Sequence, residues 1–197
     1  PVPVDPYFLG IWLGDGASAN TRITTPEPEI ESWLREFAAR EGLVLKFTAT
    51  DGLATTWSVN SGRRHGNTRD GRNTLLTRMR DLGVIDNKHI PELYKLNSRR
   101  VRLELLAGFI DTDGFLGAGT YETSQVNETL ARDIVWLARS LGFYVSLSKI
   151  QKTCANNGVI GTYWRIWISG NIEEIPVRVP RRKAPPRKMN KDCLRTG

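Results

Sequence analysis

The stretch LLAGFIDTDGFL at residues 105–116 runs from an apolar helix into acidic residues and a closing Asp-Gly. A second stretch, YFLGIWLGDGAS at residues 7–18, has the same order of apolar run, glycine and Asp-Gly. When the two are aligned on Asp-Gly, Asp15 matches Asp113. A single stretch of this kind is usually a helix that ends in an acidic turn. Two of them in one chain indicate a duplicated element.

The segments that follow the two stretches repeat as well. From Asp15 to the helix-ending Gly42 is 42 − 15 = 27 residues, and from Asp113 to Gly142 is 142 − 113 = 29 residues. In each half the order is a strand of alternating polarity, an amphipathic helix and a hairpin of two strands. The first of these helices is predicted to begin with Thr25 as N-cap and the following proline at its first position.

This duplication predicts an α+β fold of two pseudo-symmetric halves. The predicted parts are an N-terminal half at 1–85, a linker into the second motif helix at 86–104, a C-terminal half at 105–177 and a basic segment at 178–197. The two apolar helices are expected to pair at a pseudo-two-fold axis, because Gly10, Gly108 and Ala107 allow close approach. Pairing would place Asp15 and Asp113 side by side.

The charge of the chain is unevenly distributed. The 197 residues carry 28 Lys and Arg against 21 Asp and Glu, a net charge of +7, with a pI near 9.7. Residues 178–197 hold eight basic residues against one acidic residue, 8 − 1 = +7, so the remainder is neutral. The net charge indicates a polyanionic partner, and a neutral body with one basic side suits nucleic acid better than a uniform charge does. The alternative is a solubilising surface with a disordered linker.

Other sequence features narrow the class of protein. No apolar run approaches the roughly 20 residues of a membrane span, and the chain opens on no signal-peptide pattern. Cys154 and Cys193 are the only cysteines and lie far apart, which indicates neither a disulfide framework nor a zinc site. We therefore expect an intracellular protein in a reducing compartment, with access to the nucleus if the host is eukaryotic.

Two facing carboxylates imply a divalent cation. At close range unpaired carboxylates repel, and one of them is forced to protonate. Mg²⁺ binds oxygen ligands, commonly one or two carboxylates with waters and substrate phosphate, and it supports in-line displacement at a phosphodiester. We predict Mg²⁺ at Asp15 and Asp113, with Mn²⁺ as a substitute. The alternative is that both Asp-Gly pairs only end their helices.

The sequences LLAGFIDTDG and FLGIWLGDG resemble the paired signature motifs of the LAGLIDADG (dodecapeptide) homing endonucleases, in the single-chain form with two motifs. The first motif has Leu13 where the second has Asp111, a position that does not bind metal in the family. The resemblance implies an αββαββα fold in each half and two antiparallel sheets that form a saddle over the DNA major groove. It also implies staggered cleavage of both strands. The implied metal site consists of Asp15, Asp113, Gly14 and Thr112.

The resemblance is closest to the members carried inside inteins, which have a lysine in a K-x-I-P segment before the second motif. Here KHIP supplies Lys88, whose implied role is electrostatic catalysis; a solvated loop lysine is the alternative. A second basic residue is expected in PRRKAPPR, with Lys183 as the best match and Arg182 as the next. The splicing residues at both ends are missing, so the chain is interpreted as the nuclease portion of an intein.

The expected partner is double-stranded DNA with a long, near-asymmetric target site, bound by a monomer. Arg and Gln read guanine and adenine edges in the major groove, although alternation alone leaves open which face of each strand points outward. The residues expected on the DNA-facing strands are Arg22, Thr24, Lys46, Tyr121, Thr123, Gln125, Arg165 and Trp167. Further contacts, mostly to phosphates, are expected from Arg63, Arg64, Arg69, Arg72, Arg181 and Arg182. The competing function is a cleavage-inactive DNA- or RNA-binding protein, a maturase or a regulator, on the same fold.

Overall fold

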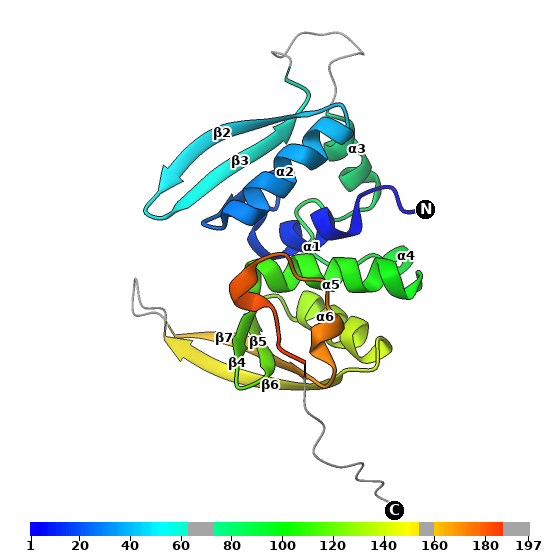
Figure 1. Ribbon diagram of the computed structural model, residues 1–197, viewed down its shortest axis with the longest axis vertical. Coiled ribbons are helices and arrows are strands. Elements are labelled where there is room, and N and C mark those ends of the chain that lie inside the picture. Colours follow the sequence, from blue (N-terminus) through cyan, green and yellow to red (C-terminus); the bar gives the residue numbers. More distant parts are fainter. Residues whose placement is uncertain (63–72, 154–159, 187–197) are drawn as a thin grey trace, which may run out of the picture.

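The computed structural model describes residues 1–62, 73–153 and 160–186. Figure 1 shows two halves stacked on either side of a central pair of helices. The elements of the first half are α1 (Pro6–Asp15), β1 (Arg22–Thr25), α2 (Pro28–Arg40), β2 (Val44–Asp51), β3 (Ala54–Asn60) and α3 (Thr74–Asp81). Those of the second are α4 (Glu92–Lys95), α5 (Arg99–Asp113), β4 (Phe115–Gly117), β5 (Thr120–Gln125), α6 (Glu128–Ser140), β6 (Tyr144–Thr153) and β7 (Ile160–Ser169). Two short 3-10 helices follow, η2 (Ile172–Glu174) and η3 (Pro180–Arg182).

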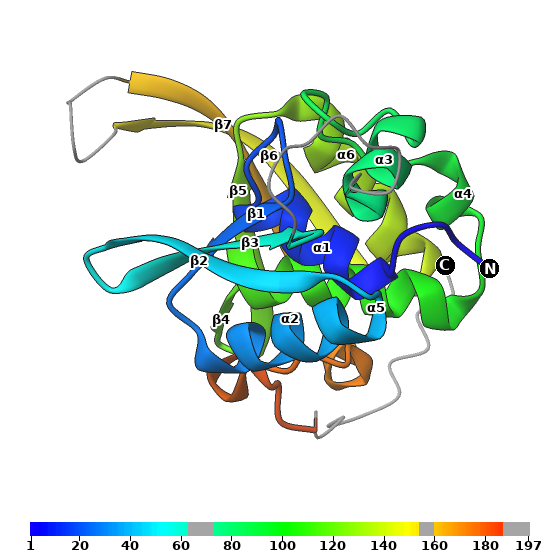
Figure 2. The same cartoon turned by 90° about the horizontal axis from the view of Figure 1, so that it is seen from above.

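Each half contributes one antiparallel sheet, with strand orders β1-β3-β2 and β4-β5-β7-β6. The predicted α+β fold with two antiparallel sheets is therefore confirmed. The two sheets differ by one strand, because the counterpart of β4 in the first half is reduced to an isolated bridge between Gly16 and Ile23. The hairpins β2–β3 and β6–β7 project from the same side of the molecule (Figures 1 and 2).

The predicted pairing of the two apolar helices is present as α1 against α5. A Cβ atom at Gly10 would lie 2.2 Å from the carbonyl oxygen of Leu105, and one at Gly108 would lie 2.3 Å from that of Tyr7. No side chain fits at either position, so the two backbones touch where both helices carry glycine. The helix α1 is buried from Tyr7 to Leu13 and forms the centre of the core.

Two predicted boundaries were wrong. The helix α2 begins at Pro28 with Glu27 in the N-cap position, because the hydroxyl of Thr25 accepts from the backbone nitrogen of Glu27 in a turn that precedes the helix. The motif helix α5 begins at Arg99, inside the stretch 86–104 that was predicted as a linker. The side chain of Ser98 caps it by accepting from the nitrogen of Val101.

The stretch 178–197 was predicted to be a basic segment, and its described part, 178–186, packs against the helix pair. The backbone nitrogens of Arg178 and Val179 donate to the buried carboxylate of Asp111 at 2.6 Å and 3.1 Å. Figure 1 shows this segment, in orange to red, returning to the end of α5. We call residues 178–184 the strap. In the described parts of the chain, no helix is long and apolar enough to cross a membrane.

Candidate metal and nucleic-acid site

The two motif aspartates are the last residues of the paired helices. Asp15 ends α1 and Asp113 ends α5. Just before them the helices are in close contact: a Cβ atom at Gly14 would lie 2.1 Å from Oγ1 of Thr112 and 3.5 Å from Cβ of Asp113. The helix pair therefore delivers both carboxylates to one place, as the glycine pattern predicted.

The two carboxylates are partly desolvated and interact with each other. Burial, followed by the charge of Asp113, raises the pKa of Asp15 to about 6. Burial also raises the pKa of Asp113, while the amide of Gln125 and the charges of Lys88 and Arg182 act in the opposite direction. Without a cation the site resists holding two negative charges. A divalent cation would relieve this, so the donor set fits one.

The candidate metal site is small. Across residues 1–62, 73–153 and 160–186, no group of three or more His, Cys, Asp or Glu side chains could hold a metal ion. Two carboxylates with water and substrate phosphate are a usual ligand set for Mg²⁺. Gly14 and Thr112 were expected as further ligands, but the carbonyl oxygen of each already accepts a hydrogen bond from a basic side chain. One lone pair on each of these oxygens remains for an ion.

Lys88 supplies one of these basic groups. Its Nζ atom donates to the carbonyl oxygen of Leu13 at 3.0 Å and to that of Gly14 at 3.3 Å, and it lies 5.2 Å above the ring of Trp12. The ammonium group of Lys88 therefore lies at the C-terminal end of α1, the negative end of the helix dipole. Burial lowers the pKa of Lys88 to about 8, against the opposing charges of Asp113 and Asp15. Lys88 is thus close to the acidic pair and is not a solvated loop lysine.

Arg182, and not Lys183, is the second basic group. Lys183 is exposed, whereas Arg182 is 6% exposed and its Nη2 atom donates to the carbonyl oxygen of Thr112 at 3.0 Å. Among the described residues, Nε and Nη1 of Arg182 are buried without a hydrogen-bond partner. Two unused guanidinium donors beside a pair of carboxylates suit the oxygens of a phosphate.

The strand β5 faces the other way from the prediction. Tyr121 and Thr123 are buried, and the Tyr121 hydroxyl donates to the carbonyl oxygen of Arg182. Gln125, predicted to read DNA, donates instead from Nε2 to the carboxylate of Asp113. The reason is that the apolar ring of Tyr121 belongs to the core, so the intervening residues, including Ser124, take the outer face. Sequence alternation gave no sign of the contact between Gln125 and Asp113.

The other predicted strand residues lie on the outer faces of the sheets. Arg22, Thr24 and Lys46 are exposed on the first sheet, where the register places Arg22, Ser58 and Lys46 side by side. On the second sheet, Arg165 and Trp167 share the outer face of β7 because Ile166, which lies between them, is buried. Arg165 is paired with Glu122 at 2.9 Å.

The predicted contacts from basic segments divide into two groups. Arg63, Arg64, Arg69 and Arg72 lie outside the described residues, as do both cysteines. Arg181 and Arg182 were expected to contact DNA, but the side chain of Arg181 pairs with Glu27 and that of Arg182 is buried at the helix ends. Both arginines belong to the strap, where Arg181 is exposed and Arg182 is buried.

Asp111 anchors the strap and has no acidic counterpart in the first motif. Besides the two strap nitrogens, its carboxylate accepts from the hydroxyl of Tyr7 at 2.8 Å. The guanidinium of Arg178 stacks on the ring of Tyr7, with 3.5 Å from Cζ to the ring centroid. Burial raises the pKa of Asp111, and these hydrogen bonds partly offset the rise. The first motif has Leu13 at this position and binds no strap there.

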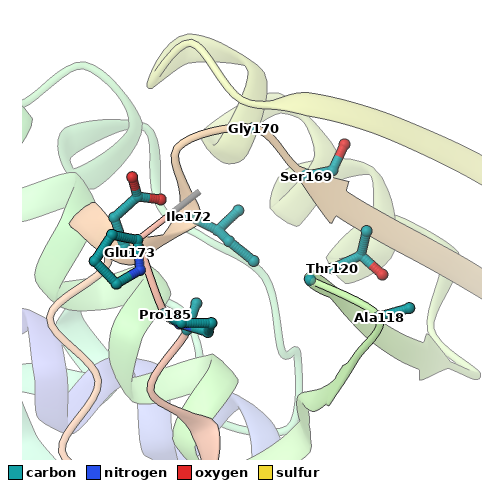
Figure 3. A pocket seen from close by; sticks show the side chains of 10 residues that line it. Ala118, Thr120, Ser169, Gly170, Ile172, Glu173 and Pro185 are labelled. Atoms are coloured by element: carbon teal, nitrogen blue, oxygen red, sulfur yellow. The ribbon is translucent and has the colours of Figure 1, made fainter. Parts of the chain in front are cut away.

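A cavity of about 310 Å³ lies elsewhere in the second half. Figure 3 shows it between Thr120, Ser169, Ile172, Glu173 and Pro185. None of the acidic or basic residues at the helix ends lines it, and Glu173 is its single charged group. The candidate chemistry therefore lies at the ends of the helix pair and not in this cavity.

Comparisons with known proteins place these features in context. Residues 89–174 match the family described as homing endonuclease. The chain is 38% identical over 141 residues to the replicative DNA helicase DnaB of Mycobacterium intracellulare, which covers 71% of this chain and 19% of the helicase. It is 29% identical over 166 residues to the homothallic switching endonuclease of Saccharomyces cerevisiae, which covers 72% of this chain and 28% of that protein. The chain thus spans less than a third of either relative.

The fold is similar to that of the homing endonuclease I-DmoI. One structure, of mesophilic variants, has a TM-score of 0.58 at 14% identity and covers 85% of this chain and 89% of that one. Another, of I-DmoI in complex with DNA and Mn, has a TM-score of 0.53 at 12% identity, with coverages of 84% and 88%. At these identities the likeness establishes the shared fold.

Proposed function

The chain is of the LAGLIDADG homing endonuclease type in its motifs and fold, and from this premise we propose that it hydrolyses both strands of DNA at a specific site with a divalent cation. One observation carries the proposal. The paired helices α1 and α5 end together in Asp15 and Asp113, and a basic side chain adjoins the end of each helix, the partly buried Lys88 at α1 and the buried Arg182 at α5. Helix ends that served only as turns would need neither the facing carboxylates nor the two cations.

The side chains divide the chemistry as follows. Asp15 and Asp113 would hold the cation, which when bound acidifies water and stabilises charge on phosphate oxygens. Lys88, with a pKa of about 8, is mainly protonated near neutral pH and acts as a positive group that stabilises the charged phosphate. Arg182, on the strap beside the end of α5, has two guanidinium nitrogens, Nε and Nη1, that lack a hydrogen-bond partner among the described residues and would donate to the same phosphate. Gln125 orients the carboxylate of Asp113.

The substrate is proposed to be double-stranded DNA with a long, near-asymmetric site. The outer face of the first sheet carries Arg22 and Lys46, while that of the second carries Arg165 paired with Glu122. Because the two faces differ in side chains, the two halves of a target would differ in sequence. A single chain supplies both sheets, which supports action as a monomer. The complex of I-DmoI with DNA and Mn supports both the DNA and the divalent ion.

An origin within an intein is also proposed. The two relatives named above are a helicase and an endonuclease, and each matches this chain over less than a third of its own length. A segment shared by proteins of different activity fits an inserted element better than a domain that serves the activity of either one.

Selection from a randomised DNA library tests the proposed function directly. The chain is incubated with the library and Mg²⁺, and cleaved ends are sequenced, with Asp113→Ala as the control. We expect one consensus site cut on both strands by the parent only. Recovery of bound but uncut DNA would contradict cleavage and support the DNA-binding alternative. Recovery of neither would contradict both.

A further inference from the structure

Lys88 and Arg182 each lie on a loop that brings a basic side chain to the end of a motif helix. Each loop is anchored by the half of the molecule that does not contain that helix. The loop of Lys88 follows α3 of the first half, and the strap of Arg182 follows β7 of the second half. Lys88 donates to the end of α1 and Arg182 to the end of α5. The distances in sequence from motif aspartate to cation are similar, 88 − 15 = 73 and 182 − 113 = 69.

Asn127 holds the Lys88 loop from the second half. Its Nδ2 atom donates to the carbonyl oxygen of Lys88 itself at 2.9 Å. Its Oδ1 atom caps α6 by accepting from the nitrogen of Leu130 at 3.1 Å. Two residues further along the loop, the nitrogen of Ile90 donates to the carboxylate of Asp133, also on α6, at 2.8 Å. The backbone that carries Lys88 is thus fixed to α6, while its ammonium group reaches α1.

Glu27 holds the strap from the first half. Its side chain is 11% exposed and makes no capping hydrogen bond to α2. Instead its carboxylate accepts from Nε of Arg181 at 3.0 Å and also from Nη2 of the same residue, and it lies 3.9 Å from Nη2 of Arg182. The strap, which leaves the second half, is therefore fixed to the N-terminal end of α2.

Glu27 and Asn127 occupy the same place in the two halves. Each is the N-cap residue of the helix that follows the motif and its strand, at 27 − 15 = 12 and 127 − 113 = 14 residues after the motif aspartate. Helix capping does not explain the contacts that these two side chains make with the loops. The side chain of Glu27 makes no capping hydrogen bond, and Asn127 caps α6 through its oxygen alone, which leaves its Nδ2 atom for the loop.

We propose that Glu27 and Asn127 are positioning residues that place Arg182 and Lys88 at the cleavage centre, each acting across the boundary between the halves. Lys88 and Arg182 keep their positions only while the two halves keep their relative placement. The placement of the two sheets on DNA is therefore coupled to the chemistry at the helix ends. The inference rests on the proposed nuclease function for its kinetic consequence, but the placement of the two cations can be measured without cleavage.

Asn127→Asp separates positioning from capping. Aspartate caps a helix as well as asparagine does, but it has no donor for the carbonyl oxygen of Lys88. On a selected target bound in advance, with both strands end-labelled, we expect Asn127→Asp to slow one strand about tenfold and Glu27→Ala to slow the other, since misplacement by about 1 Å can cost up to a hundredfold. DNA affinity should change by less than about twofold, because neither residue lies on an outer sheet face.

Combination with Lys88→Met distinguishes positioning from general loosening. If Asn127 acts through Lys88, Asn127→Asp should add little to the loss already caused by Lys88→Met, because coupled residues are not additive. Multiplying effects, or equal slowing of both strands, would overturn the proposal. Glu128→Gln, at an exposed i,i+4 pair on the first turn of α6, is the control and should cleave like the parent.

A second measurement needs no cleavage. Free protein is treated with acetic anhydride, and acetylation of each lysine is followed by peptide mass spectrometry, with exposed Lys46 as the internal reference. We expect Asn127→Asp to raise acetylation of Lys88 several-fold and to leave Lys46 unchanged. Phenylglyoxal modification of Arg182 should rise in the same way in Glu27→Ala. Unchanged labelling at both sites would overturn the inference. If labelling rises but the parent cuts no DNA, the proposed function fails and the positioning stands.

Discussion

Lys88 donates its ammonium group to the carbonyl oxygen of Gly14, which lies 3.3 Å away and 74 residues earlier in the chain. The contact places a positive charge one residue from Asp15, at the end of the first motif helix. Because Arg182 makes the corresponding contact with Thr112, the two motif helices end in equivalent surroundings built from unrelated loops. The pseudo-symmetry therefore extends from the backbone to the charges of the site.

Replacement of Lys88 should affect the two DNA strands unequally. Lys88→Met removes the charge at the end of α1 and leaves Arg182 at α5, so we expect one strand to be cut at least tenfold more slowly than the other. Strand-resolved cleavage of doubly end-labelled DNA measures the ratio. Lys183→Met, which removes the exposed lysine next to Arg182 in the strap, is the matched control. A ratio that equals the parent's would exclude a role for Lys88 in the chemistry.

An added methyl group between the motif helices should strongly destabilise the protein. Gly108→Ala places a Cβ atom 2.3 Å from the carbonyl oxygen of Tyr7, an overlap that the paired backbones can relieve only by moving apart. We expect a loss of about 3 kcal/mol or more in the free energy of unfolding. Urea denaturation measures it, with Ala39→Ser on the exposed face of α2 as a control. A loss below about 1 kcal/mol would mean that the pair is not tightly packed.

The acidic pair should make the metal-free protein sensitive to pH. The pKa of Asp15 rises from 3.8 to about 6 on folding, so the folded state holds this proton more firmly than the unfolded state does. The resulting stability is fully present below about pH 4 and is lost as the pH rises through about 6, by roughly 1 to 3 kcal/mol.

Asp15→Asn isolates this effect from the titration of other carboxylates. The variant should gain stability relative to the parent between about pH 4 and pH 7 in the presence of a chelator, and added Mg²⁺ should reduce the gain by binding the parent. Urea unfolding across this range measures the difference. A difference that does not vary with pH would show that Asp15 is not forced toward its neutral form.

Asp111 should be required for the strap. Asp111→Leu copies the residue of the first motif, Leu13, but leaves two strap nitrogens and the Tyr7 hydroxyl without their acceptor. Each buried donor without a partner costs about 1 to 3 kcal/mol, so we expect either loss of folding or release of the strap. Limited trypsin digestion should cut after Arg178, Arg181 or Arg182 in the variant and not in the parent. Glu104→Gln, which removes a partly exposed partner of Arg178, should remain protected. Equal protection in Asp111→Leu would contradict the assignment.

Features with a strong local signal could be predicted from the sequence. Gly10 and Gly108 recur at one position of a repeated apolar helix, and only close helix packing explains glycine at both, so the pairing and the meeting of Asp15 and Asp113 followed. Lys88 was identified because KHIP is a short motif beside a helix start.

The roles of other site residues could not be predicted, because they depend on contacts between parts of the chain that are far apart in sequence. Arg182 and Lys183 are adjacent, and loops of unequal length leave the register open; burial of one of the two decides between them. The outer face of β5 was misassigned because Tyr121 suits a core and a DNA surface equally well. The role of Asp111 required knowledge of where a strap nearly 70 residues away returns to the helix end.

The central claim is that Asp15 and Asp113 together form a metal-dependent cleavage centre at the ends of the paired helices. Single-turnover cleavage of a selected DNA site in Mg²⁺ tests it, with DNA affinity measured in parallel for the parent, Asp15→Asn and Asp113→Asn. The account predicts that each variant binds DNA as tightly as the parent and cuts neither strand at a measurable rate. Cleavage at the parent's rate by either variant would contradict it.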